Sequence, residues 1–127
     1  MPATEKEDRI GKQIIDSALK VHKALGPGLL ERVYETCLAY ELEQRGLKVE
    51  RQVAAPIQYG KIQFDEGFRI DLLVEDCIII ELKAAEKPIP LWQAQLISYL
   101  RLTERHLGYL INFNKPLLKQ GIQRIAI

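Results

Sequence analysis

The stretch that decides the fold is Phe68-Arg69-Ile70-Asp71-Leu72-Leu73-Val74-Glu75-Asp76-Cys77-Ile78-Ile79-Ile80-Glu81-Leu82-Lys83. It contains two short apolar runs, residues 70–74 and 77–80, separated by the acidic pair Glu75-Asp76. Short runs rich in β-branched residues are typical of strands, and a polar pair between them is typical of a tight turn. The segment therefore predicts a β-hairpin whose second strand continues to Lys83.

The charged residues of this hairpin stand in apolar surroundings. Glu81 follows four consecutive apolar residues, so its strand is predicted to be buried on both faces. Lys83 lies two residues further on and shares the face of Glu81, because side chains alternate along a strand. Asp71 lies opposite these two residues if the hairpin pairs residue 73 or 74 with residue 77 or 78.

Two facing carboxylates, Asp71 and Glu81, need compensation. At about 4 Å they repel by roughly 4 kcal/mol at an effective dielectric constant of 20. Lys83 supplies one positive charge, and a divalent cation would supply two more. Hard oxygen ligands suit magnesium or manganese. The alternative is an ordinary hairpin stabilised by a Lys–Glu pair between the strands.

The whole chain has 127 residues, which predicts one domain spanning residues 1–127. Its 47% hydrophobic and 28% charged residues are typical of a globular protein. The net charge of +1 does not indicate a general nucleic-acid binder, but residues 101–127 carry five Lys or Arg and one acid. This basic quarter either faces phosphates or is a solvated edge.

The sequence also bears on the compartment in which the protein is found. Cys37 and Cys77 stand forty residues apart in apolar settings, without the spacing of a metal site or a disulfide framework. No signal peptide and no apolar run of about 18 residues is present in the sequence. We therefore expect buried free thiols, a soluble cytoplasmic protein and no membrane partner.

Periodicity and turn residues predict the order α-α-β-β-β-β-α-β-β. The helix at 5–25 has Thr4 and Glu7 at capping-box spacing and ends at Gly26, with His22 bonded locally near its end. The remaining predictions are helices at 29–45 and 91–105 and strands at 47–53, 55–59, 107–113 and 122–127. A turn at 59–61 leads the chain back toward 62–64, and a further turn or bulge is predicted at 65–67.

Several motifs together resemble a known family. The spacing Asp71-x9-Glu81-x-Lys83 resembles the PD-(D/E)XK nuclease motif, with Ile70 where that motif has proline. The stretch from Val21 to Glu35 resembles the signature of GxxExxY proteins, small bacterial and archaeal members of the same superfamily. Gly28, Glu31 and Tyr34 fill the named positions, and the resemblance covers about residues 10–127, including 95–100 and 108–113.

The resemblance implies a restriction-endonuclease-like α/β core, a mixed β-sheet flanked by helices, with an extra N-terminal helix. It also implies a nuclease dependent on Mg²⁺ or Mn²⁺ that acts on DNA more than on RNA. Asp71, Glu81 and the carbonyl of Leu82 would hold the metal, and Glu31 would complete the site directly or through water. Lys83 would orient and help deprotonate the attacking water.

Further residues are assigned to the substrate. Gln95 and Tyr99, at i and i+4, match the Gln-x3-Tyr motif of RecB-type nucleases and would position the strand. Tyr34 shares a helix face with Glu31 and is assigned the same role. Arg69 either neutralises Asp71 or contacts a phosphate. Trp92 stands where the family usually has His, which leaves any accessory role there unassigned.

Two other functions stay open on the sequence alone. The fold could serve as a non-catalytic module for nucleic-acid binding or protein assembly, because a fold does not fix a function. A homodimer joined through the edge at residues 122–127 is the third hypothesis.

Overall fold

The computed structural model describes residues 3–127, in which five strands form one sheet in the order β1-β2-β3-β4-β5. β3 and β4 are parallel and every other neighbouring pair is antiparallel, so the sheet is mixed, as the resemblance implied. The elements in chain order are α1 (Glu5–Leu25), α2 (Glu31–Gln44), β1 (Val49–Tyr59), β2 (Ile62–Val74), β3 (Ile78–Lys83), α3 (Pro90–Leu102), β4 (Leu107–Asn112), the 3₁₀ helix η1 (Leu118–Gly121) and β5 (Ile122–Ala126).

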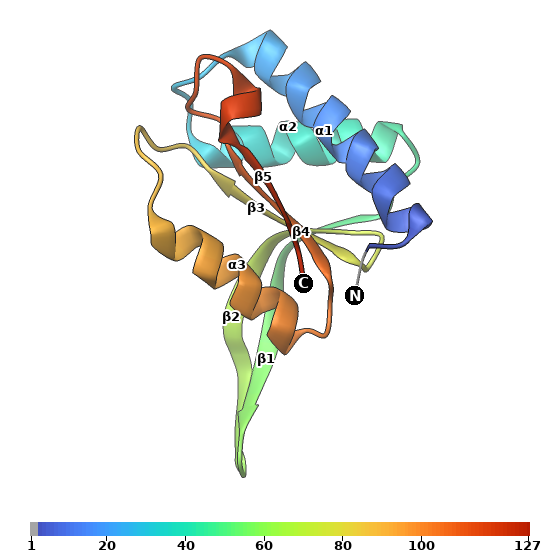
Figure 1. The fold of residues 1–127 in the computed structure, drawn as a ribbon, viewed down its shortest axis with the longest axis vertical. Helices are drawn as coiled ribbons and strands as arrows, with labels where there is room; N and C mark the ends of the chain where they lie inside the picture. The colour runs from blue at the N-terminus through green and yellow to red at the C-terminus, as the bar shows by residue number, and fades with distance from the viewer. Residues whose placement is uncertain (1–2) are drawn as a thin grey trace.

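The helices cover both faces of the sheet. Figure 1 shows α1 and α2 on one side and α3 on the other. The larger apolar core lies beneath α1 and α2, and a smaller one lies beneath α3, where Leu96 and Leu100 are fully buried. α3 makes the crossover between β3 and β4, because parallel neighbours need a long connection. The predicted α/β core with an extra N-terminal helix is confirmed.

α1 begins at the predicted capping box. The side chain of Thr4 accepts from the N–H of Glu7 at 3.1 Å, and the N–H of Thr4 donates to the Glu7 carboxylate at 2.8 Å. The helix ends at Gly26, which has a φ of +71° that glycine adopts without strain. His22 bonds through Nε2 to the carbonyl of Lys115 at 2.7 Å, so the predicted local bond is wrong.

The central hairpin has one of the registers that the sequence left open. Val74 pairs with Ile78, and Leu72 pairs with Ile80. Glu75 and Asp76 have φ values of +51° and +60°, as a tight primed turn between twisted strands requires. Glu81 is 5% exposed, so the predicted burial of its strand is confirmed.

The predicted number of strands before α3 was wrong, because three are present rather than four. Pro56 does not end β1, since proline is tolerated on an edge strand. Residues 65–67 form a bulge inside β2, where the register changes from Ala55↔Phe68 to Ile57↔Phe64. β1 and β2 therefore continue as one long hairpin.

Three smaller outcomes complete the fold. α3 ends at Leu102, three residues earlier than predicted, and Glu104 follows it with a φ of +57°. Cys37 and Cys77 are free but only partly buried. No helix within residues 3–127 combines the length and apolar character needed to cross a bilayer.

Candidate active site

The site lies where β2 and β3 separate. Their backbone pairing stops at Leu72↔Ile80. Beyond it, the N–H of Asp71 donates to the carboxylate of Glu81 at 2.9 Å, and the N–H of Leu82 donates to the carboxylate of Asp71 at 2.8 Å. Side chains thus replace the backbone ladder, and both carboxylates are fixed at the point of separation.

Side-chain alternation also breaks at this level. Leu72 packs in the core beneath α1 and α2, whereas Ile70, two residues away, packs in the core beneath α3. In β1, Val49 packs against the core beneath α1 and α2, whereas Val53 packs against the core beneath α3. Residues two or four apart in a regular strand share a face, so both strands change faces here. This irregularity leaves Asp71 open to α2 as well as to β3.

Gln52 stands opposite this break and connects two acids. It has a φ of +52°, which is uncommon for a residue other than glycine. Its Nε2 donates to Glu35 Oε1 at 2.5 Å and lies 3.4 Å from Asp71 Oδ1. Glu35 is 7% exposed and also accepts from Arg51 at 3.0 Å. α2 is therefore tied to Asp71 through one amide.

The site is a cluster of acids with one cation. Burial, followed by the charge of Asp71, raises the pKa of Glu81 to about 8. Burial also raises the pKa of Asp71, and burial and then Asp71 raise the pKa of Glu31. The charge of Lys83 lowers the pKa of all three acids and so offsets part of these shifts.

Lys83 does not form a simple pair with one acid. Within the described part of the chain, residues 3–127, no ion pair within 4.0 Å involves it. Its Nζ lies 5.5 Å from the ring centroid of Trp92 on α3. An aromatic ring attracts a cation in this position. The structure thus gives Trp92 a contact that the sequence left unassigned.

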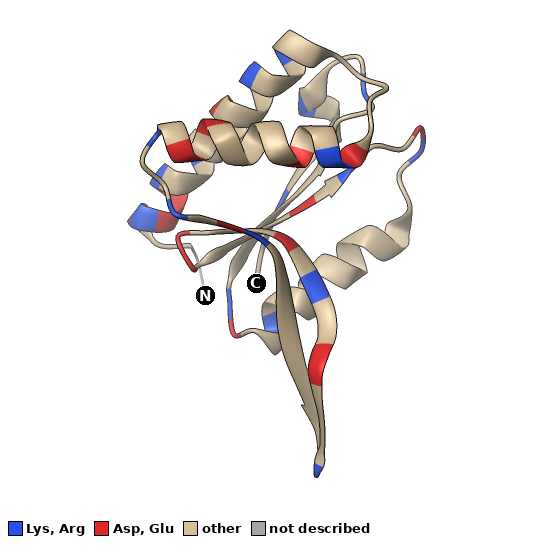
Figure 2. Ribbon diagram, turned by 180° about the vertical axis from the view of Figure 1, so that it is seen from behind, with Lys and Arg blue, Asp and Glu red and all other residues tan. Residues whose placement is uncertain are grey.

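The structure brings most of the predicted residues near one another. Glu31, at the start of α2, is close enough to Asp71 and Glu81 for their charges to act on each other. Tyr99 is raised in pKa by burial and then by the charges of the same two acids. Gln95 lies one turn before Tyr99 on α3 and is partly buried. Figure 2 shows acidic positions on α2, β2 and β3.

Two predicted substrate residues have other partners. Arg69 forms an ion pair with Glu66 at 2.6 Å, rather than with Asp71. Tyr34 is fully buried, donates to the carbonyl of Gly26 at 2.6 Å and accepts from the N–H of Leu29 at 3.1 Å. Tyr34 thus holds the loop between α1 and α2, and its contact with substrate stays a prediction.

Glu35 and Gln52 were not predicted. Glu35 stands four residues after Glu31 on the same helix face, so its position in the sequence could have indicated it. Gln52 lies in an alternating strand pattern that gives no sign of a left-handed backbone. Its role depends on the irregularity shared with β2.

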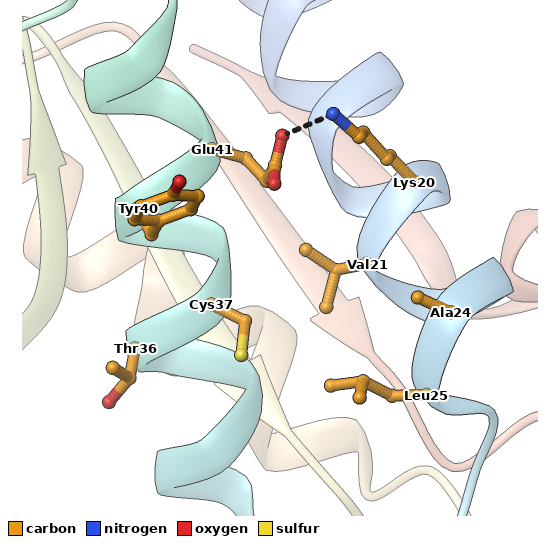
Figure 3. Close-up of a pocket in the computed structure, with 8 residues that line it drawn as sticks. All are labelled: Lys20, Val21, Ala24, Leu25, Thr36, Cys37, Tyr40 and Glu41. Carbon is orange, nitrogen blue, oxygen red and sulfur yellow. Dashed lines mark ion pairs between the residues drawn. The ribbon is translucent and has the colours of Figure 1, made fainter.

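A separate apolar pocket of about 330 Å³ lies between α1 and α2. Figure 3 shows Val21, Leu25 and Cys37 in it, with the ion pair of Lys20 and Glu41 at one end. None of the clustered acids lines this pocket. The candidate site is therefore separate from this apolar pocket.

The donor set fits a hard divalent cation. Carboxylate oxygens are its preferred ligands, and Mg²⁺ is commonly bound by one or two carboxylates together with several waters. Asp71 and Glu81 supply that pair. Among residues 3–127, no three Asp, Glu, His or Cys side chains are placed so that they could hold a metal ion together. Waters and a backbone carbonyl would therefore make up the remaining ligands.

Paired carboxylates at the separation of two strands, on a mixed sheet flanked by helices, define a restriction-endonuclease-like protein. A family model described as the PD-(D/E)XK nuclease superfamily matches residues 8–125. The chain therefore belongs to that superfamily, whose members generally use divalent metals and act on nucleic acids. No curated protein and no solved structure matches the sequence.

Proposed function

We propose that the protein is a nuclease that hydrolyses the DNA backbone with a magnesium- or manganese-activated water. The observation that carries the proposal is the reciprocal pair of hydrogen bonds that fixes Asp71 and Glu81 beside Lys83. Membership of the nuclease superfamily supports a nucleic-acid substrate. DNA rather than RNA, and GxxExxY as the subfamily, remain parts of the proposal.

Asp71, Glu81 and the carbonyl of Leu82 would hold the metal ion, with Glu31 as a direct or water-mediated ligand. The bound ion would neutralise phosphate charge and lower the pKa of the attacking water. Lys83 Nζ would orient that water and help to remove its proton. Gln52 would fix the direction of the Asp71 carboxylate, since its amide already lies between Asp71 and Glu35.

The substrate would lie across α3 and β2. Gln95 and Tyr99 would position the strand, and Arg69 would meet a phosphate after leaving Glu66. Breaking the ion pair between Arg69 and Glu66 costs little, because exposed ion pairs contribute only about 0–1 kcal/mol. Catalysis would come from positioning and charge neutralisation, without a covalent intermediate.

The test is cleavage of duplex, single-stranded and branched DNA with Mg²⁺, Mn²⁺, Ca²⁺ or EDTA. We expect cleavage with Mg²⁺ or Mn²⁺ and none with EDTA. Lys83→Ala should abolish cleavage but keep DNA binding, because Lys83 is one of several positive charges. A matched control is Lys87→Ala, which removes an exposed lysine just beyond the site.

Equal cleavage by wild type and Lys83→Ala would assign the activity to a contaminant or another site. A second candidate function is a non-catalytic binding or assembly module. It is favoured by the finding that, in the described part of the chain, no three Asp, Glu, His or Cys side chains are placed to hold a metal ion. Calorimetric titration with Mn²⁺ separates the two functions. If wild type binds Mn²⁺ and Glu81→Gln does not, the nuclease is supported. If wild type does not bind Mn²⁺, the non-catalytic module is supported.

A further inference from the structure

A narrow β-arm, defined as residues 56–67, projects from the sheet. Figure 1 shows this distal part of β1 and β2 extending well beyond the helices. It is joined by the tight turn at Gly60, whose φ is +59°. All of its residues except Ile57 are exposed, so the arm has little contact with the rest of the protein.

One face of the β-arm is apolar. Ile57 pairs with Phe64, and Tyr59 pairs with Ile62. Cross-strand partners and residues two apart share a face, so these four side chains form one strip. Tyr59, Ile62 and Phe64 are 78%, 56% and 51% exposed. Contiguous exposed apolar residues of this kind mark an interaction surface.

The strip continues toward the candidate active site. Phe68 pairs with Ala55, which shares the face of Ile57 on β1. The ring of Phe68 stacks on Tyr99 with centroids 4.2 Å apart and planes 9° apart. Tyr99 in turn lies within the electrostatic range of Asp71 and Glu81. A ligand that binds at Asp71 and Glu81 and extends over Tyr99 and Phe68 would therefore reach the β-arm.

The charges of the arm favour bases over phosphates as its ligand. Lys61 is the basic residue of the arm, and Asp65 and Glu66 are its acids. Glu66 pairs with Arg69 at the base of the arm. A groove that follows a phosphate backbone is strongly basic, whereas flat aromatic side chains stack on unpaired bases.

The area of the strip disfavours a homodimer held by it alone. Complete burial of Tyr59, Ile62 and Phe64 would cover on the order of 400 Å² per chain, given roughly 200 Å² for a large side chain. A stable interface covers about 800 Å² per partner.

We propose that the β-arm binds unpaired nucleic-acid bases next to the cleavage site, so that the substrate class is single-stranded nucleic acid or a duplex with a single-stranded extension. This proposal rests on the proposed function, because the substrate of the acidic site would supply those bases. Tyr59 and Phe64 stack on the bases, and Ile62 excludes water between them.

The experiment measures binding of fluorescent oligonucleotides by anisotropy in EDTA, which prevents cleavage. The probes are a 30-nucleotide single strand, its blunt duplex and the duplex with a ten-nucleotide extension. The variants are Tyr59→Ser, Phe64→Ser and the double substitution, and Tyr40→Ser is the control because Tyr40 is an exposed tyrosine on α2, away from the arm. Far-UV circular dichroism and thermal melts establish that each variant is folded.

We expect wild type to bind the single strand and the extended duplex at least tenfold more tightly than the blunt duplex. Each arm substitution should raise the Kd for the single strand at least about fivefold, and Tyr40→Ser should not. The dependence of log K on log salt should stay unchanged in Tyr59→Ser, whereas Lys61→Gln should reduce its slope by about 0.7.

Arm variants that bind the single strand as tightly as wild type would overturn the proposal, even if the protein cleaves DNA. Equal affinity for single strand and blunt duplex would also overturn it. Sedimentation that finds a wild-type dimer and a monomeric double variant would assign the strip to self-association instead. If wild type does not cleave DNA but the arm substitutions still weaken binding of the single strand, the proposed function is wrong and the β-arm stands as a binding element.

Discussion

Glu81 combines burial, a like charge and a short contact with the backbone of its neighbour. It is 5% exposed, and its carboxylate accepts from the N–H of Asp71. The unfolded chain would ionise this group near its ordinary pKa of 4.5, whereas the folded protein holds the proton up to a pKa of about 8. Its ionisation therefore links stability to pH.

Without metal, wild type should lose stability as the pH rises from 5 to 8. A folded-state pKa above the unfolded one means that the folded state binds more protons in this window, so the free energy of unfolding falls with rising pH. The contribution of Glu81 is fully present below about pH 4.5 and is lost through about pH 8. We expect a loss of about 3–5 kcal/mol, measured by denaturant titration in EDTA.

The control for this effect is Glu81→Gln, which keeps the shape and can still accept from Asp71. It should have a much flatter pH profile and be at least as stable as wild type at pH 8. A variant several kcal/mol less stable than wild type without metal would identify Glu81 as a structural partner of Lys83 instead. The ordinary-hairpin hypothesis would then hold.

Gln52 shows how a backbone irregularity can serve a side chain. Its positive φ suits glycine better, yet its amide joins Glu35 to Asp71. Gln52→Gly should keep the free energy of unfolding within about 1 kcal/mol, because relief of backbone strain offsets the lost contacts. It should lower kcat about tenfold or more with little change in KM, because a displacement of about 1 Å at a reacting group can cost 100-fold.

Gln52→Asn is the matched variant for kinetic comparison. Asparagine tolerates the same backbone conformation, and its amide is one methylene shorter. An intermediate kcat is expected for it. Wild-type kcat in Gln52→Gly would show that Asp71 does not depend on this amide.

At the scale of elements, α1 approaches the sheet closely at Gly11. A Cβ built at Gly11 collides with the Tyr109 hydroxyl and lies 3.1 Å from the ring carbon that bears it. Tyr109 is on β4 and is 2% exposed, so its ring has little room to move. Glycine at this position sets the distance between α1 and the strand.

Gly11→Ala should therefore destabilise the protein by about 1–3 kcal/mol, the usual cost of overpacking a core. Chemical denaturation measures this cost, with Lys12→Ala as the exposed control on the same helix. Adding Tyr109→Phe removes the colliding hydroxyl and should restore part of the stability. A Gly11→Ala protein as stable as wild type would mean that α1 shifts freely on the sheet.

At the scale of the whole molecule, metal binding and folding should be linked. A ligand that binds only the folded state stabilises it by RT ln(1 + [L]/Kd), so about 10 mM Mg²⁺ with a Kd on the order of 1 mM gives roughly 1.4 kcal/mol. This corresponds to a rise of about 3–5 °C in Tm. Ca²⁺ should stabilise wild type as well, without supporting cleavage.

The measurement is a pair of thermal melts for each protein, with EDTA and with Mg²⁺. Glu81→Gln should lose most of the rise in Tm with Mg²⁺. Tyr40→Ser should keep it, because Tyr40 lies on the side of α2 opposite Glu31. Equal shifts in wild type and Glu81→Gln would place the ion outside the candidate site.

The sequence alone predicted the features that depend on neighbouring residues. Thr4 and Glu7 lie three apart and form their capping box, and Gly26 ends the helix because it tolerates the left-handed backbone. Apolar runs around Glu75-Asp76 predicted the central hairpin, and the observed register is one of those that the sequence left open. The mixed sheet was implied by the resemblance to PD-(D/E)XK nucleases, which the spacing of Asp71, Glu81 and Lys83 helps to carry.

Tertiary structure alone decided the features that depend on distant partners. The sequence predicted separate strands at 47–53 and 55–59 and a turn or bulge at 65–67, but pairing with β2 makes β1 continuous and absorbs residues 65–67 as a bulge. His22 bonds to Lys115, ninety-three residues away, because the fold brings these two segments together. Gln52 connects α2 with β2 only because both strands change faces together. The local pattern of residues is enough to predict helices, turns and strands. A long-range contact stabilises the protein only once the chain has closed the loop between its two partners, so neighbouring residues do not reveal it.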